Sequence, residues 1–310
     1  MKTKNKKEPA GLKILTGAGM LSVKALLIAF VFSSCGRFGN KQDETKQGKE
    51  RIVCVSKQLT ELVFALGAGD KIVAVDLSST YPEAVKKLPT VGYHRMLSAE
   101  GIISMKPSVV FYNSGQDASI GPATVLPQLQ KVGIPLKEWK GTENIEDTKA
   151  LIHDLGIYLH AEAKADSLCK KLDADMQLAA IKLKDYTDNP RVMIIHFGRA
   201  SNIYFPFGRQ GAGNSMIGWA GGVNAIDTSS KFRTLSAEIL VKCQPEVILA
   251  TDFGYDRLGG LDKFKELPGI ALTPAAKSNR IYRVEEHDLL YFGPRTGENV
   301  LKLIELIHKK

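Results

Sequence analysis

Short apolar runs alternate with amphipathic stretches through most of the chain after residue 50. Ile52–Val55 is uniformly apolar and predicts a buried strand. Ser56 is suited to cap a helix over 58–66, which Gly67 would end. Further strands are predicted at 71–75, 109–112, 135–139 and 192–195, and further helices at 98–105 and 122–132. Strands that alternate with helices predict mainly parallel sheets covered by helices.

The segment 143–186 has a different pattern, with apolar residues at helical spacing and many charges between them. We expect Gly156 to divide it, and we predict one long amphipathic helix over about 161–186. Asn189–Pro190 would end this helix. A new α/β region begins near residue 192, so the pattern predicts two α/β lobes joined by a helical spacer.

The N-terminus carries a targeting pattern. Lysines are frequent in residues 1–24, an apolar stretch covers 25–32, and Ser33–Ser34–Cys35 follows. The apolar stretch is shorter than the ~20 residues of a spanning helix, which indicates a secretory signal. A Cys after two small residues resembles a bacterial lipobox, with Cys35 as the lipidated first mature residue. The alternative is an ordinary signal peptide with an incidental Cys.

These patterns divide the chain into five predicted segments. They are a signal peptide (1–34), a flexible polar tether (35–50), an N-terminal α/β lobe (51–140), a helical spacer with the long helix (141–190) and a C-terminal α/β lobe (191–310). We expect the protein at the extracytoplasmic face of a bacterial membrane, or in the periplasm. ATP and NAD(P)H are not dependable there, which favours binding or cofactor-independent chemistry.

Composition and charge narrow the possibilities further. The chain has 310 residues, of which 44% are hydrophobic and 24% charged, as in ordinary folded proteins. Its four cysteines form no C-x-x-C pair, which argues against a disulfide scaffold or a zinc knuckle. The formal charge of +9 is concentrated in the leader, and no basic stripe with interleaved aromatic residues occurs. We therefore expect no nucleic-acid binding.

An internal repeat links the two predicted lobes. Leu97–Ile102 (LSAEGI) and Leu235–Leu240 (LSAEIL) are each followed by a Pro and an apolar strand, and every counterpart lies 138 positions later. Arg95 and Arg233 match at the same offset. Each Glu of the repeat falls in the first turn of a Ser-capped helix, where it favours the helix dipole. The simpler alternative, that this is merely a helix-start pattern, does not explain the shared spacing.

These motifs resemble a known family. The block 51–76 (RIVCVSKQLTELVFALGAGDKIVAVD), Tyr81–Pro82, 88–92 (LPTVG) and the Glu-x-Ile…Lys-Pro-x-Val-Val block resemble class III periplasmic binding proteins, which serve ABC importers of cobalamin, siderophores and haem. The segments 92–101 (GYHRMLSAEG), 220–224 (AGGVN) and 292–297 (FGPRTG) are similar to the haem-transport branch. The resemblance implies two lobes bridged by one long helix, with the ligand between them. It also implies a monomer that works with an ABC permease and its ATPase.

The resemblance implies a haem-iron ligand at Tyr93, supported by Arg95 and Arg233. Phenolate is an axial ligand type for ferric haem, and a phenol with a reference pKa near ~10 needs a nearby cation to ionise. His94 is expected to point away from Tyr93, since neighbouring side chains alternate in extended chain. Further candidates for contact with haem are Arg295, through a propionate, and more weakly His196, His287 and Tyr291.

Glu100 and Glu238 match the family's two glutamates that dock on a permease; helix-cap electrostatics is the simpler alternative.

We found no G-x-S-x-G, P-loop or H-E-x-x-H motif, so no enzyme is predicted. The resulting hypothesis is a lipid-anchored protein that captures haem and delivers it to an ABC importer. Open alternatives are a ferric-siderophore or cobalamin carrier of the same class, and an extracytoplasmic metal-dependent enzyme.

Overall fold

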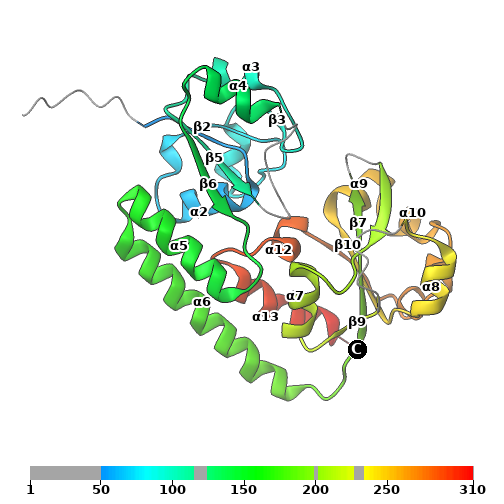
Figure 1. Cartoon of the computed structure of the whole chain (residues 1–310). Coiled ribbons are helices and arrows are strands. Elements are labelled where there is room, and N and C mark those ends of the chain that lie inside the picture. The colour runs from blue at the N-terminus through cyan, green and yellow to red at the C-terminus, as the bar shows by residue number, and fades with distance from the viewer. Residues whose placement is uncertain (1–49, 115–123, 199–201, 227–233, 310) are drawn as a thin grey trace, which may run out of the picture. The chain divides into compact units, whose positions relative to one another are not determined.

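The computed structural model describes residues 50–114, 124–198, 202–226 and 234–309. The predicted leader, Cys35 and Arg233 lie outside these residues. In the described part, two α/β lobes each have their own sheet, and one long helix connects them (Figure 1). The predicted fold class is confirmed, whereas the predicted segment boundaries stay predictions. Among the described residues, no helix is both long and apolar enough to cross a membrane.

The N-terminal lobe is built on a parallel four-stranded sheet with the order β2-β1-β5-β6. Apolar residues fill both faces, as expected for a parallel sheet covered by helices. Ile52 and Cys54 pack with the α5 and α6 side, whereas Val53 and Val55 pack with the α3 and α4 side. The elements are β1 (Ile52–Cys54), α2 (Lys57–Ala65), β2 (Ile72–Val75), β3 (Gly92–Tyr93), β4 (Met96–Leu97), α3 (Ala99–Ser104), β5 (Val109–Ser114), α4 (Val125–Lys131) and β6 (Leu136–Lys140).

The C-terminal lobe is built on a sheet with the order β11-β10-β7-β8, to which β9 adds beside β7. Only β8 runs antiparallel to its neighbour. The elements are β7 (Arg191–Gly198), β8 (Ile203–Pro206), α7 (Ala212–Trp219), β9 (Val223–Asn224), α8 (Ala237–Cys243), β10 (Val247–Thr251), α9 (Asp252–Leu258), α10 (Leu261–Lys265), α11 (Pro274–Lys277), β11 (Ile281–Val284), α12 (Glu286–Leu290) and α13 (Thr296–Ile307). Short 3-10 helices lie at Gly69–Lys71, Glu83–Lys87, Leu183–Asp185 and Ile270–Leu272.

Two helices, α5 (Ile145–Leu159) and α6 (Glu162–Lys182), form the spacer. The prediction that Gly156 divides this segment is wrong, because the break comes at His160, which has a left-handed backbone conformation. Gly156 lies inside α5, where an added Cβ would approach the Cβ of Ala165 to 2.6 Å. The glycine therefore allows the two helices to pack closely.

The long helix α6 belongs to both cores. Leu172 is fully buried in the core of the N-terminal lobe, and Ala179, two turns later, is buried in the core of the C-terminal lobe. Met176 lies between them and packs against both clusters. Because one rigid helix contributes to both cores, it limits the freedom of the lobes to rotate against each other.

Candidate functional site

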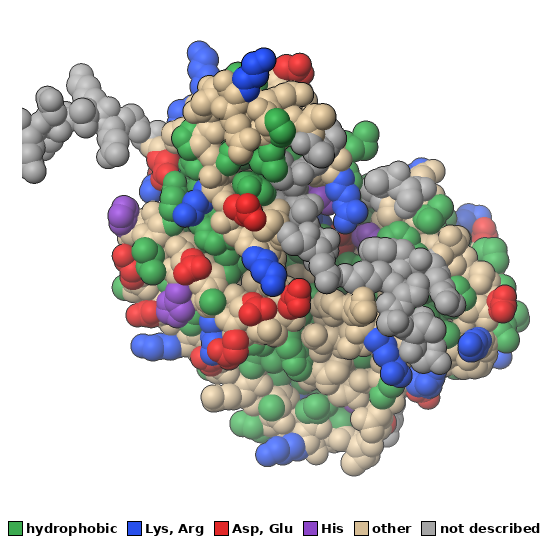
Figure 2. All heavy atoms as spheres, viewed as in Figure 1, with side chains coloured by type: hydrophobic (Ala, Val, Ile, Leu, Met, Phe, Trp, Pro, Cys, Tyr) green, Lys and Arg blue, Asp and Glu red, His purple; other side chains and the backbone are tan. Residues whose placement is uncertain are grey.

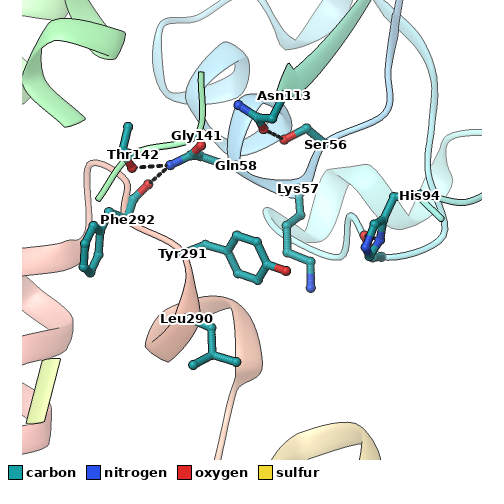
Figure 3. Close-up of a pocket in the computed structure, with 11 residues that line it drawn as sticks. Ser56, Lys57, Gln58, His94, Asn113, Gly141, Thr142, Leu290, Tyr291 and Phe292 are labelled. Atoms are coloured by element: carbon teal, nitrogen blue, oxygen red, sulfur yellow. Dashed lines mark hydrogen bonds between the residues drawn. The ribbon is translucent and has the colours of Figure 1, made fainter. Parts of the chain in front are cut away.

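A cleft opens between the lobes at the carboxyl ends of their strands, where parallel α/β sheets commonly bind ligands. A small cavity in this cleft is open to solvent on one side. Side chains of both lobes face this space (Figure 3), and Figure 2 shows histidine and basic side chains at the hollow between the lobes. The N-terminal lobe contributes Ser56, Lys57, Gln58, Ser78, His94 and Asn113, and the C-terminal lobe contributes Leu290, Tyr291 and Phe292.

The floor of the cavity is polar and joins the lobes. Ser56 directly follows β1, caps α2 by accepting a hydrogen bond from Leu59 N, and bonds to Asn113 at the end of β5. Gln58 Nε2 donates to the backbone oxygen of Phe292 and to Thr142 Oγ1, both at 2.7 Å. The first turn of α2 therefore both lines the cavity and holds the opposite wall.

Lys57 lies beside this floor with its charge already compensated. Its ammonium group is 3.1 Å from Glu286 of the C-terminal lobe and 4.5 Å from the ring centroid of Tyr291. Tyr291, a predicted haem contact, therefore lines the cavity and points toward it together with Lys57 (Figure 3).

Behind the cavity, a buried carboxylate connects the lobes. Glu61 on α2 is 4% exposed, and it contacts His287 Nε2 and, at 2.7 Å, Arg295 Nε. The guanidinium of Arg295 also lies 2.7 Å from Asp288 and 3.7 Å above the ring centroid of Tyr81. We call Glu61, His287 and Arg295 the inter-lobe cluster. It gives His287 and Arg295, both predicted haem contacts, a protein partner in the other lobe.

His287 and Arg295 also set the protonation state of Glu61. Burial alone would raise the pKa of this carboxyl, but hydrogen bonds and charges from His287 and Arg295 outweigh it and hold the pKa below its ordinary value. Glu61 is therefore ionised at neutral pH and serves as the anion that both His287 and Arg295 contact.

Tyr93 lies on a tight hairpin at the edge of the N-terminal lobe. Gly92–Tyr93 pairs with Met96–Leu97, which leaves His94 and Arg95 as a two-residue turn. Gly92 has a φ of +105°, and a Cβ there would lie 2.9 Å from the Met96 oxygen, so only glycine fits without strain. Tyr93 is half-buried, and Arg95 at the turn is exposed.

His94 does not point away from Tyr93 as expected. The two ring centroids are 4.2 Å apart, and His94 is buried beside the cavity. The expectation assumed extended chain, in which neighbouring side chains alternate, whereas His94 begins the hairpin turn. The turn brings Tyr93, His94 and Arg95 together, while Arg233 lies outside the described residues.

His196 lies in the C-terminal lobe on β7 among aromatic rings. Its Nδ1 is 3.1 Å from Thr251 Oγ1, and its ring contacts Phe205 and Phe207 at centroid distances of 5.3 and 5.6 Å. His196 is half-buried and, like Tyr93 and Arg95, is not among the residues that line the cavity. No cluster of three or more His, Cys, Asp or Glu suited to a metal ion occurs among the described residues.

The internal repeat has the same local geometry in both lobes. Ser98 and Ser236 cap α3 and α8 by accepting hydrogen bonds from Gly101 N and Ile239 N. Each helix is followed by a residue with positive φ, Lys106 and Gln244, directly before the Pro of the repeat. Glu100 and Glu238, in the first turns of these helices, are both exposed.

Glu61, Lys57 and Asp76 organise the site, although none of them was predicted from the sequence. Asp76 directly follows β2 and is fully buried, and a charged residue after an apolar strand was the available signal. Lys57, Gln58 and Glu61 share one face of α2 by their spacing. Nothing in the pattern distinguishes a polar face that meets water from one that meets another lobe.

Two lobes with a shared helix and a cleft at the carboxyl ends of the strands define a solute-binding protein. The periplasmic binding protein family model matches residues 52–287, so the chain belongs to that family. An uncharacterised ABC transporter substrate-binding lipoprotein of Bacillus subtilis, YvrC, is 30% identical over 273 residues, covering 87% of this chain and 83% of YvrC. The chain is thus the extracytoplasmic substrate-binding protein of an ABC importer. Members of this family carry solutes without catalysis, which confirms that the chain is not an enzyme.

Two further relatives differ in the ligand that their names give. The periplasmic haem-binding protein RhuT from Roseiflexus sp. RS-1 is 34% identical, with a TM-score of 0.77, and the match covers 84% of this chain and 98% of RhuT. A vitamin B12-binding protein of Vibrio parahaemolyticus is 25% identical over 258 residues, covering 83% of this chain and 88% of that protein. The relatives therefore agree on a solute carrier but not on its ligand.

Proposed function

We propose that the chain binds haem in the cleft between its lobes and delivers it to an ABC permease. The observation that carries this proposal is the Gly92–Leu97 hairpin, which holds a half-buried Tyr93 next to an exposed Arg95. Phenolate is an axial ligand for ferric haem, and a nearby guanidinium lowers the cost of ionising the phenol. The likeness to RhuT, whose name gives haem as its ligand, supports the same choice.

The remaining haem contacts are proposed from the sequence pattern and, for the described residues, from their positions. Arg233 is proposed as the counterpart of Arg95 from the C-terminal lobe. His196 and Tyr291 are proposed as contacts on that lobe's side of the cleft. Arg295 and His287 remain candidates, but both already contact Glu61, so a propionate at Arg295 would have to share or displace this carboxylate.

Delivery and anchoring complete the proposal. Glu100 and Glu238 are exposed in equivalent first turns of α3 and α8, which suits a permease with two basic patches. Cys35 is proposed as the lipidated residue that attaches the protein, as a monomer, to the membrane. The name of YvrC, which includes the word lipoprotein, supports the anchor.

The test is a haemin titration of the purified mature protein, followed through the Soret band. Tyr93→Phe removes the iron ligand and keeps the ring, so we expect at least about tenfold weaker binding, or about 1.4 kcal/mol. The matched control is Tyr282→Phe on β11, a half-buried tyrosine that packs against the core of the C-terminal lobe. If wild type shows no Soret shift with haemin, haem is not the ligand; if Tyr93→Phe binds like wild type, Tyr93 is not the iron ligand.

Cobalamin is the second candidate, because the Vibrio parahaemolyticus relative is named for vitamin B12. The same titration with cyanocobalamin distinguishes the two, since tight cobalamin binding together with absent haemin binding would replace the proposal. A ferric siderophore, the remaining alternative, is tested by intrinsic fluorescence quenching with a panel of ferric chelates.

A further inference from the structure

His94 connects a buried acid to the arginine beside Tyr93. The Asp76 carboxylate is completely buried, and it accepts hydrogen bonds from Ser78 N at 2.8 Å, from the Ser78 hydroxyl, and from Ser79 Oγ at 2.6 Å. His94 Nδ1 lies 3.0 Å from Ser78 Oγ and 3.7 Å from Asp76 Oδ2. On the other edge of the ring, Arg95 Nε donates to His94 Nε2 at 3.3 Å.

The hydrogen bonds assign one tautomer to His94. The Ser78 hydroxyl donates its only proton to Asp76, so its oxygen accepts, and His94 Nδ1 must carry the proton. Nε2 is then an acceptor, which matches the N–H of Arg95. The Nδ1–H tautomer thus satisfies both neighbours, and the Nε2 lone pair is already engaged by the guanidinium.

The ring also fixes the ligand hairpin sterically. It is 8% exposed and packs against the Tyr93 ring with a centroid distance of 4.2 Å. Asp76 follows β2 directly, so it belongs to the rigid sheet. The hairpin turn by contrast has an exposed arginine and only two paired residues on each strand. His94 is therefore a side-chain connection between the rigid sheet and the hairpin residues that are proposed to meet the ligand, beside the backbone bonds that join the hairpin to the end of β2.

We propose that His94 is a positioning residue, which Asp76 and Ser78 hold in place and which in turn orients Arg95 and the Tyr93 ring for contact with haem iron. The inference rests on the proposed haem function. It assigns His94 no bond to iron, because Nε2 serves Arg95. A loosely held phenol loses conformational entropy when it binds iron, and this loss weakens the bond. A phenol that is already held in position avoids this cost.

Two amide substitutions test the contacts at the two edges of the His94 ring separately. The amide of His94→Gln comes close to the position of Nε2 and can still accept from Arg95. The amide of His94→Asn comes close to the position of Nδ1 and retains only the Ser78 contact. Each variant breaks one half of the connection, so we expect both to bind haemin more weakly than wild type. His94→Gln, which loses the Ser78 contact, should lose at least about threefold in affinity. His94→Asn, in which Arg95 loses its acceptor, should lose about tenfold and show a weaker phenolate-to-iron charge-transfer band.

Metal-free protoporphyrin IX is the matched ligand control, because it has the macrocycle and propionates without iron. Its affinity should be the same in wild type and in both variants, and a parallel loss for protoporphyrin would mean general damage to the cleft and overturn the inference. Equal haemin affinity and equal spectra in His94→Asn and wild type would also overturn the inference.

Thermal melting of each variant identifies a folding defect. An Arg95→Ala change should weaken haemin binding less in the His94→Asn background than in wild type. Failure of wild type itself to bind haemin would overturn the proposed function and this inference with it.

Discussion

Neutralising Glu61 should destabilise the protein far more than neutralising a surface glutamate. Glu61→Gln keeps the side-chain volume, so it opens no cavity, but it removes the negative charge shared by His287 and Arg295. Removal of one partner from a buried ion pair costs about 3–5 kcal/mol. The lower end applies here because Arg295 retains Asp288 at 2.7 Å and the ring of Tyr81. We therefore expect a loss of about 3 kcal/mol at pH 7.

The assay is urea unfolding of the mature protein, with the free energy obtained by linear extrapolation. Glu83→Ala is the control, because Glu83 forms an ion pair with Lys86 in which both side chains are more than half exposed. Exposed pairs of this kind contribute little, so the control should unfold at the wild-type midpoint. A loss below about 1 kcal/mol in Glu61→Gln would refute the reasoning, since it would make the inter-lobe cluster equivalent to a surface pair.

The same variant carries a pH signature. The folded pKa of Glu61 lies below the ordinary value of 4.5, so its stabilisation is fully present above that value and is lost as the pH falls toward the folded pKa. The stability gap between wild type and Glu61→Gln should therefore be narrower at pH 4 than at pH 7. A gap that widens on acidification would contradict the assignment of Glu61 as the ionised member of the cluster.

Two predictions concern the protein in the cell. Cys35→Ala should release the protein from membranes, and a variant that still sediments with salt-washed membranes would place the anchor elsewhere. Glu100→Ala/Glu238→Ala should bind haemin normally but slow haem-dependent growth at limiting haem, because complementary charges direct docking more than affinity. Normal growth of the double variant would refute docking, and either single variant should grow better than the double variant because one lobe still docks.

Local signals predicted most of the fold. Ser56 caps α2 and Gly67 follows it with a φ of +85°, as the sequence pattern predicted. The repeat predicted the equivalent caps at Ser98 and Ser236. Such features depend on residues within one turn of each other, so their physics is contained in a short stretch of sequence. The break at His160 was missed because a non-glycine residue in the left-handed conformation has no strong sequence signature.

The candidate site was only partly predictable, because its contacts join residues far apart in the chain. The apolar face of α2 was evident from its spacing, and its polar face would ordinarily be assigned to water. That face instead meets α12 and the following loop, with Gln58 paired 234 residues away and Glu61 paired 226 residues away. Lys57 lines the cavity and also pairs with Glu286 across the lobes. The residues that set the orientation of the lobes are thus continuous with those that line the cavity, so a ligand that contacts Lys57 or Tyr291 also acts on the connection between the lobes.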